Sequence, residues 1–414
     1  MKTLYISKAK NALLPIIVLP CLFKGCYVFN DIDLFTDLEE QLKILHLLNI
    51  NTNYYNRTLY IDSTKLFVPN NLEIKQNKRT RGMVYFMGAL LKYKKFIVFN
   101  KPGGCDIGLR KIDMHLEFFE KLKSNVIETK NNIEINSDQY DEYENINYHF
   151  KKISVGSTIN SILSSIHGKD TTVNLTNIAI DPYINDLINI LKKINVDILL
   201  DTKNRNIKIN RTTKDYIDNT LYYSVIQDPI IIGTYIVMCL IFDKKYIIPI
   251  DDIKILGSFL DYIMKIGVKY DEVMEKQYIF YVDNINRKQI VVETSEFPGF
   301  YTDLQPLFVC LCNHYSVNLE VIENIMDNRF TYLDELKQIG YNYIYISKNH
   351  IKLLEFNLNT NVKEINFTDL RGGFVIYIEL MKNKFNLSDI HIKNYDVILR
   401  GYNMNYINDI FNLN

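Results

Sequence analysis

The residues of this chain with the clearest chemical potential lie at positions 102–110, which read Pro-Gly-Gly-Cys-Asp-Ile-Gly-Leu-Arg. The adjacent glycines Gly103 and Gly104 let the backbone turn tightly and approach a ligand. Cys105 follows at once, and a guanidinium such as that of Arg110 favours a reactive thiolate and binds anions. This spacing indicates a reactive thiol beside an anion site. The alternative is a surface turn with an incidental cysteine.

Two further segments have the composition of anion sites. Arg81 lies in Arg-Thr-Arg-Gly-Met at positions 79–83, directly before a long apolar helix. An arginine at a helix N-terminus forms a ready anion site. Residues 152–157, Lys-Ile-Ser-Val-Gly-Ser, lead into a helix start rich in hydrogen-bond donors. The alternatives are a surface arginine near a cap and an ordinary capping segment.

Composition limits the class of protein. The 414 residues suffice for two or three domains, and a hydrophobic content of 47% with 23% charged residues is ordinary for a globular protein with a substantial core. Lys plus Arg and Asp plus Glu both number 48, so the net charge is zero. This balance argues against a general nucleic-acid or anionic-membrane surface, and local anion sites remain compatible with it.

Cysteine usage and the N-terminus indicate a cytoplasmic protein. The six cysteines form no CxxC pair and no Cys/His metal spacing, so we expect reduced thiols and no metal site. Three early lysines followed by residues 11–23 are similar to a signal peptide, but Pro15 and Pro20 interrupt the apolar run and no small-residue cleavage site follows. No other run approaches the roughly 20 apolar residues of a membrane span.

A strand-like run recurs about every 70 residues. Its copies have the β-branched and aromatic alternation of half-buried strands, at residues 26–32, 96–100, 172–178, 246–253, 317–322 and 385–392. Helix-like segments follow at 38–48, 112–122, 183–194, 256–266, 332–339 and 404–411, and another apolar helix precedes most of the strands. We predict an α/β protein with a helix–strand–helix–strand unit used six times. Alternation without true repeats is the alternative.

Several separated motifs carry a resemblance over nearly the whole chain, from Ser7 to Tyr402. They are Ser-Lys-Ala-Lys-Asn-Ala-Leu-Leu-Pro at 7–15, the Cys105 segment, Lys-Ile-Ser-Val-Gly-Ser at 152–157, Thr-Asp-Leu-Gln at 302–305, Asp-Asn-Arg-Phe at 327–330, Thr-Asp-Leu-Arg at 368–371 and Arg-Gly-Tyr at 400–402. This set resembles the UDP-N-acetylglucosamine enolpyruvyl transferases. Those enzymes transfer enolpyruvate from phosphoenolpyruvate to the sugar nucleotide, the first committed step of peptidoglycan synthesis.

The resemblance implies a two-domain inside-out α/β barrel with six βαβ-type repeats, three per domain, and with helices inside and sheets outside. The chain would start in one domain, make the other whole and then return. We place the crossings near residues 6–10 and 224–228. The expected domains are therefore 1–9 plus 228–414, and 10–227 with the Cys105 loop.

The resemblance also implies a role for each matching residue. Cys105 would act as a general acid toward the methylene carbon of phosphoenolpyruvate, and Asp303 would be the base for the 3′-hydroxyl of the sugar. Lys10 and Asp369 complete the implied catalytic set. The implied substrate contacts are Lys10, Asn11, Arg81, Arg110, Asp113, Lys152, Ser154, Val155, Asp303, Ile325, Arg329, Arg371 and Arg400. Six of these cations, Lys10, Arg81, Arg110, Arg329, Arg371 and Arg400, would form a cationic cleft for two anionic substrates.

The match departs from the family pattern at several points. Lys8 replaces a glycine and Lys111 replaces a proline. The Arg-Glu-Pro-Glu turn is Ile-Asp-Pro-Tyr at 180–183, and Asp-Arg-x-Glu-x-Gly-Thr is Asp-Pro-Ile-Ile-Ile-Gly-Thr at 228–234. These changes put the efficiency of turnover in doubt.

Two alternatives remain beside the transferase. 5-Enolpyruvylshikimate-3-phosphate synthase shares the fold and chemistry but lacks the cysteine loop. A non-catalytic homologue would keep the sugar nucleotide as a sensor's ligand or serve as a structural partner. For the transferase we expect the two small-molecule substrates, no cofactor, no metal, no nucleic acid, no membrane and no obligate protein partner.

Overall fold

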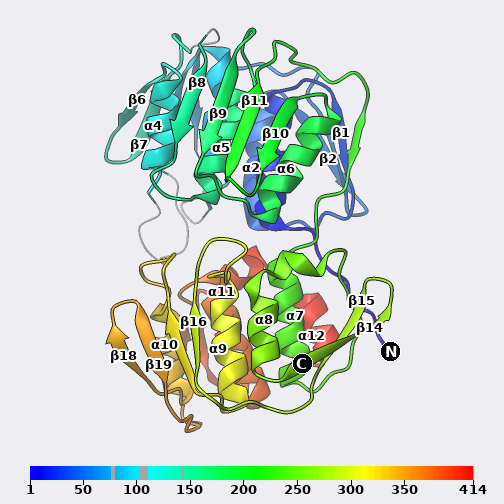
Figure 1. Ribbon diagram of the computed structural model, residues 1–414, viewed down its shortest axis with the longest axis vertical. Helices are drawn as coiled ribbons and strands as arrows, with labels where there is room; N and C mark the ends of the chain where they lie inside the picture. Colours follow the sequence, from blue (N-terminus) through cyan, green and yellow to red (C-terminus); the bar gives the residue numbers. More distant parts are fainter. Residues whose placement is uncertain (76–79, 102–110, 141–143, 414) are drawn as a thin grey trace. The chain divides into compact units, whose positions relative to one another are not determined.

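The computed structural model describes residues 1–75, 80–101, 111–140 and 144–413 of the 414-residue chain. The described residues form two compact units (Figure 1). The first unit lies within residues 8–226, and the second unit holds residues 1–7 together with residues 227–413. Each unit has its own hydrophobic core.

The first unit contains three four-stranded sheets in the described part of the chain, with the orders β12-β1-β3-β2, β4-β5-β7-β6 and β8-β9-β11-β10. Its strands are β1 Cys26–Phe29, β2 Asn51–Tyr55, β3 Thr58–Asp62, β4 Asn71–Ile74, β5 Phe96–Asn100, β6 Asn125–Glu128, β7 Asn132–Asn136, β8 Ile146–His149, β9 Thr172–Thr176, β10 Asp197–Asp201, β11 Asn206–Asn210 and β12 Leu221–Tyr223. Its helices are α1 Lys10–Ile16, α2 Thr36–Leu47, α3 Val84–Leu90, α4 Asp113–Lys121, α5 Val155–Ser165 and α6 Pro182–Lys193, with 3-10 turns at Leu19–Cys21 and Leu91–Tyr93.

The second unit contains three sheets among its described residues, with the orders β13-β15-β14, β16-β17-β19-β18 and β20-β21. Its strands are β13 Ile248–Pro249, β14 Val268–Met274, β15 Gln277–Val282, β16 Ile290–Glu293, β17 Leu319–Ile322, β18 Tyr343–Ser347, β19 His350–Leu353, β20 Glu364–Asn366 and β21 His391–Lys393. Its helices are α7 Pro229–Ile241, α8 Ser258–Lys265, α9 Gln305–His314, α10 Thr331–Ile339, α11 Leu370–Lys382 and α12 Met404–Phe411, with 3-10 turns at Ile253–Leu256, Leu387–Asp389 and Tyr395–Arg400.

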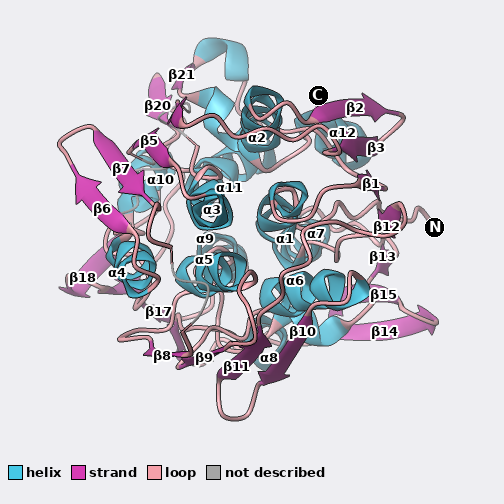
Figure 2. Ribbon diagram, turned by 90° about the horizontal axis from the view of Figure 1, so that it is seen from above, coloured by secondary structure: helices cyan, strands magenta, loops and turns pink. Residues whose placement is uncertain are grey.

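The most complete repeats have the order strand, helix, strand, helix, hairpin. In the repeat β8-α5-β9-α6-β10-β11, the two strands around α5 are parallel and the hairpin adds antiparallel strands. A parallel pair requires a crossover, and a helix is the usual one. The crossover helix is consequently enclosed by the sheets. Figure 2 shows α1, α3 and α5 inside a surround of strands in the first unit. In the second unit, every residue of α7 is buried.

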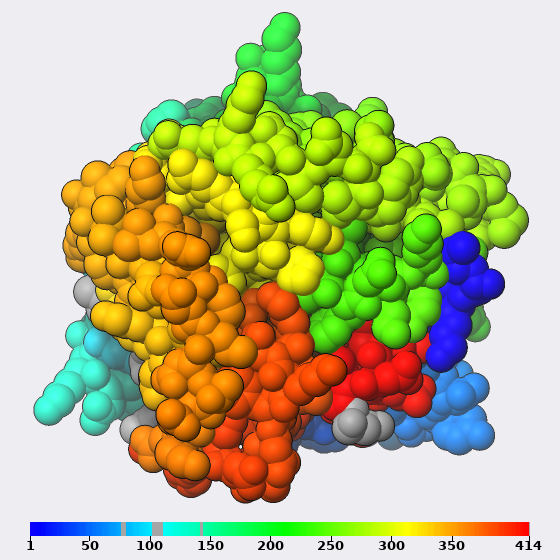
Figure 3. Space-filling view, turned by 90° about the horizontal axis from the view of Figure 1, so that it is seen from below, coloured from blue at the N-terminus to red at the C-terminus, as the bar shows by residue number. Residues whose placement is uncertain are grey.

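The two crossing segments supply strands to sheets that the chain builds elsewhere. β12, which precedes the return to the second unit, pairs in parallel with β1. Thr3 forms a parallel bridge with Ile247, and Leu4 N–H donates to the Ile247 carbonyl at 2.8 Å. Figure 3 shows these N-terminal residues, in blue, lying beside the green and red segments of the second unit. The second unit is therefore built from chain that precedes and follows the first unit, whereas the first unit closes on itself by pairing its last strand with its first.

The predicted α/β fold is confirmed, and most of the predicted elements are found within a few residues of their expected places. One predicted strand is wrong: residues 385–392 form the 3-10 turn Leu387–Asp389, and β21 begins at His391. The predicted repeat, helix–strand–helix–strand, also lacked two strands. In the complete repeats one more strand precedes the first helix, and two strands, paired as a hairpin, follow the second helix. Among the described residues, no helix has both the length and the apolar character needed to cross a membrane.

Asn160 joins three helices of the first unit. Its side chain is fully buried in α5. Its Nδ2 donates to the Val84 carbonyl of α3 at 2.8 Å and to His115 Nδ1 of α4 at 2.9 Å. Its Oδ1 accepts from Gly88 N–H at 3.2 Å. One amide thus satisfies buried polar groups on two neighbouring helices.

Asn160→Ala should lower the free energy of unfolding of the first unit by about 2–4 kcal/mol, because it leaves several buried polar groups without partners. Chemical denaturation followed by circular dichroism measures this change. The matched control is Asn174→Ala, which removes an exposed amide contact to Asn147 on a strand surface. That control should stay within about 0.5 kcal/mol of the unaltered protein. Equal losses in the two variants would contradict the role of Asn160.

Candidate active site

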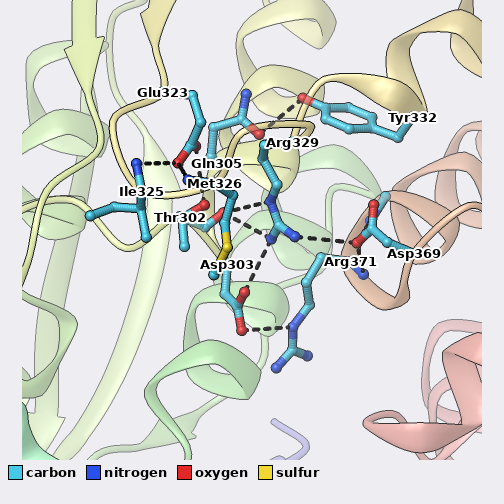
Figure 4. A network of polar contacts seen from close by, with 11 residues as sticks. Thr302, Asp303, Gln305, Glu323, Ile325, Met326, Arg329, Tyr332, Asp369 and Arg371 are labelled. Atoms are coloured by element: carbon cyan, nitrogen blue, oxygen red, sulfur yellow. Dashed lines mark hydrogen bonds and ion pairs between the residues drawn. The ribbon is translucent and has the colours of Figure 1, made fainter. Parts of the chain in front are cut away.

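Arg329 is the buried centre of a polar network in the second unit (Figure 4). Its side chain is 1% exposed. Nε and Nη2 donate to the Thr302 carbonyl at 3.1 and 2.9 Å, Nη2 lies 3.1 Å from Asp303 Oδ1, and Nη1 lies 3.3 Å from Asp369 Oδ1. Burial opposes its charge, but the carboxylates of Asp369, Asp303 and Glu323 outweigh that effect and raise the pKa of Arg329. Arg329 therefore stays charged and fixes two carboxylates.

Asp369 caps helix α11. Its Oδ1 accepts from the backbone N–H groups of Arg371 at 2.9 Å and Gly372 at 3.1 Å, in addition to the contact with Arg329. A carboxylate suits this position because unpaired N–H groups and the helix dipole both favour negative charge there. Its side chain is 1% exposed and Oδ2 has no hydrogen-bond partner in the described structure. Asp369 thus connects the cap of α11 to Arg329.

Asp303 is held from two sides and keeps access to solvent. Its Oδ2 lies 3.4 Å from Nε of Arg371, whose guanidinium lies over the Tyr402 ring at 5.1 Å. Burial opposes the charge of Arg371, but Tyr402 and Asp303 raise its pKa. The Asp303 side chain is 28% exposed, compared with 1% for Asp369. Of these two carboxylates, Asp303 is the one that a ligand can reach.

Sequence reasoning missed Glu323, which lies directly after β17. This buried carboxylate accepts hydrogen bonds from Thr302, Ile325 and Met326. The predicted contact residue Ile325 is therefore tied to the network through its backbone. A carboxylate at the end of an apolar strand, two positions before a predicted contact, was the available signal. Arg400 is buried at the end of a 3-10 turn, and a side chain in place of the next residue, Gly401, would meet Leu370 and Arg371.

In the first unit, Lys10 and Asn11 form the first turn of the buried helix α1. Lys10 Nζ lies 2.9 Å from Asp37 Oδ2 of α2 and 5.4 Å from the centre of the Phe35 ring. The Lys10 side chain is 14% exposed and Asp37 is 3% exposed. This ion pair fixes the position of the ammonium group at the start of α1. Gln41, also in α2, donates to the carbonyls of Leu14 and Gly82, and so connects α1 to the turn before α3.

Arg81 lies in that turn before α3, and its Nη2 donates to the Lys111 carbonyl at 3.4 Å. Lys111 precedes α4, whose first residue is the exposed Asp113. His115, two residues further on, is another residue that sequence reasoning missed. It is 4% exposed, and burial together with the charge of Arg81 lowers its pKa to about 3. A lone histidine on an amphipathic helix gives little signal in the sequence.

Helix α5 begins at Val155, with Ser154 as its N-cap. Ser154 Oγ accepts from Ser157 N–H at 3.3 Å, and Lys152 is exposed just before the cap. A side chain in place of Gly156 would contact the His115 ring. The start of α5 therefore lies next to α4, which carries His115 and Asp113.

The structure thus forms two groups of predicted residues, one in each unit. The first unit brings together the starts of α3, α4 and α5, and Gln41 joins α1 to them. The second unit brings together Asp303, Arg329, Asp369 and Arg371. Cys105 and Arg110 lie outside the described residues. Within the described ranges, no cluster of three or more His, Cys, Asp or Glu side chains is suited to hold a metal ion.

Arg329→Met should lower the free energy of unfolding of the second unit by about 3–5 kcal/mol, because it leaves buried carboxylates without their cation. Denaturant titration measures the loss. Arg287→Met, at an exposed arginine of the same unit, is the control and should change stability by less than about 0.5 kcal/mol. A loss below about 1 kcal/mol for Arg329→Met would mean that Asp303 and Asp369 do not depend on this cation.

His115 should make the first unit sensitive to acid. Its pKa is about 3 when folded and its ordinary value is 6.5, so the unfolded chain binds the proton first. The stabilising effect of the neutral imidazole is complete above pH 6.5 and is lost as the pH falls toward 3. Stability should therefore decline by about 1.4 kcal/mol per pH unit from this residue alone. His115→Asn keeps an acceptor for Asn160 and should remove this part of the slope in denaturation experiments at several pH values. An unchanged slope would contradict the assignment.

Comparisons with known proteins identify the family of the chain. The family model for EPSP synthase (3-phosphoshikimate 1-carboxyvinyltransferase) matches residues 2–406. A UDP-N-acetylglucosamine 1-carboxyvinyltransferase of Pelagibacter ubique is 30% identical over 383 residues, which cover 92% of this chain and 88% of that protein. UDP-N-acetylglucosamine 1-carboxyvinyltransferase 2 of Clostridium acetobutylicum is 31% identical over 384 residues, covering 90% and 86%.

Two solved structures share the fold at low sequence identity. The enolpyruvyl transferase NikO from Streptomyces tendae aligns with a TM-score of 0.82 at 13% identity, over all of this chain and 94% of that one. EPSP synthase from Acinetobacter baumannii aligns with a TM-score of 0.68 at 13% identity, over 98% and 95% of the two chains. The resemblance found in the motifs is confirmed, and the chain belongs to the EPSP synthase (3-phosphoshikimate 1-carboxyvinyltransferase) family of enolpyruvyl transferases.

Proposed function

We propose that this protein transfers enolpyruvate from phosphoenolpyruvate to the 3′-hydroxyl of UDP-N-acetylglucosamine and releases phosphate, as the first committed step of peptidoglycan synthesis. Relatives about 30% identical over most of the chain carry the name UDP-N-acetylglucosamine 1-carboxyvinyltransferase, which supports this acceptor. Cys105 supports the same choice, because 5-enolpyruvylshikimate-3-phosphate synthase lacks this cysteine loop.

The observation that carries the proposal is the state of Asp303. This carboxylate is 28% exposed and lies within 3.4 Å of the guanidinium groups of Arg329 and Arg371. A general base requires a carboxylate that is reachable and held in one orientation. Asp303 meets both conditions, so it is suited to accept the proton of a sugar hydroxyl. Asp369 is proposed to act through Arg329, because its own side chain is buried.

The reaction balances with one acid and one base. The methylene carbon of phosphoenolpyruvate gains a proton, for which Cys105 is the proposed donor, while the sugar oxygen attacks the adjacent carbon and Asp303 accepts the hydroxyl proton. The resulting tetrahedral adduct then loses a proton from the new methyl group and expels phosphate, which restores the carbon–carbon double bond. Positive groups stabilise the charge that develops on the phosphate and carboxylate.

The first unit supplies the proposed anion contacts. Lys10, Arg81 and Lys152 lie at or just before the starts of helices, where backbone N–H groups also favour anions.

We propose that Lys10, Arg81 and Arg110 contact phosphoenolpyruvate. Lys152, Ser154 and Val155 are proposed for the diphosphate, Asp113 for the uracil, and Asn11 and Ile325 for the sugar. Arg371 and Arg400 complete the proposed contacts, whereas the donors of Arg329 are engaged by protein groups and suit positioning.

The domain boundaries remain part of the proposal, with domain 1 formed by residues 1–9 plus 228–414 and domain 2 by residues 10–227. Closure of two domains would exclude water from the reaction. We further propose that the enzyme works in the cytoplasm, without a cofactor or metal, on its two small-molecule substrates.

Phosphate release by the purified protein tests the function. Release should require both substrates, and Asp303→Ala and Cys105→Ala should each reduce kcat by on the order of 10²-fold or more. Asp283→Ala, which removes an exposed carboxylate of the second unit, should leave kcat unchanged.

Two results would contradict this assignment. Release with shikimate 3-phosphate in place of the sugar nucleotide would indicate the related synthase. Heat protection by UDP-N-acetylglucosamine without any phosphate release would indicate a non-catalytic binding protein.

A further inference from the structure

We propose that Glu323 is a positioning residue that holds the Ile325 segment and the turn carrying Asp303 in one fixed geometry. The inference rests on the proposed function, because it concerns the residues assigned there to the sugar and to the base. Glu323 touches neither substrate in this proposal. It acts through Thr302, Ile325 and Met326.

Both oxygens of the Glu323 carboxylate are engaged. Oε1 accepts from Ile325 N–H and from Met326 N–H, each at 3.0 Å, and Oε2 accepts from Thr302 Oγ1 at 3.1 Å (Figure 4). The side chain is buried, with 3% of the residue exposed. Hydrogen bonds to a buried carboxylate are stronger than those between neutral groups. The carboxylate therefore holds two separate chain segments together.

The backbone of Glu323 is itself anchored to a sheet. Its N–H donates to the Asn349 carbonyl at 2.8 Å, and Asn349 Nδ2 donates to the Glu323 carbonyl at 3.3 Å. Asn349 directly precedes β19, which pairs with β17. The carboxylate thus projects from a rigid element, which is the arrangement that positions a functional group most accurately.

A short series of contacts connects Glu323 to the proposed base. The Thr302 carbonyl accepts a hydrogen bond from Arg329 Nη2, and the Thr302 hydroxyl donates to Glu323 Oε2. Asp303 is the next residue in the chain and pairs with the same Arg329. A displacement of Thr302 consequently moves Asp303 and its cation together. A shift of about 1 Å in such a group can reduce the rate by on the order of 10²-fold.

Geometry and charge can be separated by two substitutions. Glu323→Ala removes the acceptor for both N–H groups and for the hydroxyl. Glu323→Gln keeps an oxygen for Ile325 and Met326, and its amide can donate to Thr302 Oγ1 after the hydroxyl turns. The glutamine variant therefore removes the negative charge beside Arg329 while preserving the positions of the two segments.

Glu379 provides a matched control in the same unit. It is a fully buried glutamate of α11, and its Oε1 accepts from Tyr341 Oη at 2.7 Å and from Cys310 Sγ at 3.0 Å. Glu379→Ala leaves buried donors unsatisfied, as Glu323→Ala does, but none of the residues that it contacts belongs to the network of Figure 4. A loss caused by general destabilisation should appear equally in both alanine variants.

Steady-state phosphate release and amide hydrogen exchange on the full chain form the test. Glu323→Ala should lower kcat/KM for UDP-N-acetylglucosamine by on the order of 10²-fold, with a higher KM for the sugar nucleotide and a lower kcat. The KM for phosphoenolpyruvate should change little. The amides of Ile325 and Met326 should lose exchange protection in this variant. Glu323→Gln should restore most of the protection and of kcat/KM, and Glu379→Ala should keep both.

Three outcomes would overturn the inference. Wild-type kinetics in Glu323→Ala would exclude a positioning role while leaving the proposed function intact. A glutamine variant as impaired as the alanine variant would assign the effect to charge and not to geometry. A wild-type protein that releases no phosphate would overturn the proposed function, and the role of Glu323 with it.

Discussion

The charge of Arg329 is the constraint on which the second unit depends. A guanidinium that is 1% exposed is tolerated only because Asp303, Asp369 and the Thr302 carbonyl occupy its donors. Those partners come from two places, the turn before α9 and the cap of α11, and Arg329 itself lies in a third, the loop between β17 and α10. Satisfying one buried cation therefore fixes the relative positions of three segments. The proposed base acquires its orientation as a consequence.

The repeat architecture explains why polar chemistry gathers at helix starts. A helix enclosed by sheets is buried along its length, as α7 shows, so a polar side chain in its middle needs an internal partner, as Asn160 of α5 and Glu379 of α11 have. The N-terminal end of a helix offers unpaired N–H groups and positive potential to polar side chains. Lys10, Ser154 and Asp369 each lie at such an end. The same fold rule, applied several times, places polar side chains at the starts of helices in different repeats.

The sequence was sufficient for the fold class because amphipathic and apolar periodicities are local signals. It was insufficient for β20, which is three residues long and too short to show alternation, and for the bounds of β13, which has two residues within the strand predicted at 246–253. The strand expected at 385–392 failed because Asn386 accepts from Ser388 N–H and caps the 3-10 turn Leu387–Asp389 in the middle of that range. The motifs located Asp303, Asp369 and Arg371. Glu323 and His115 escaped because their importance lies in buried hydrogen bonds between segments that are distant in sequence.

Several helices of the first unit end with a left-handed residue that is not glycine. Asn49, Lys123 and Asn195 follow α2, α4 and α6 with φ values of 58°, 60° and 65°. Helices commonly end with a left-handed residue, and asparagine adopts that conformation more readily than other residues with a side chain. The two asparagines suit these positions, and Lys123 is the most strained of the three.

The buried arginines of the second unit are accompanied by carboxylates. Arg329 and Arg371 lie close to Asp303, and the charges of Asp369 and Glu323 also act on Arg329. Part of the positive charge of these arginines is therefore balanced by protein groups. In the first unit, Lys152 is exposed and Arg81 is partly exposed at helix starts, and Lys10 pairs with Asp37. The first unit therefore presents more accessible positive charge at these positions than Arg329 and Arg371 do, and the second unit is organised around a balanced network of acids and bases.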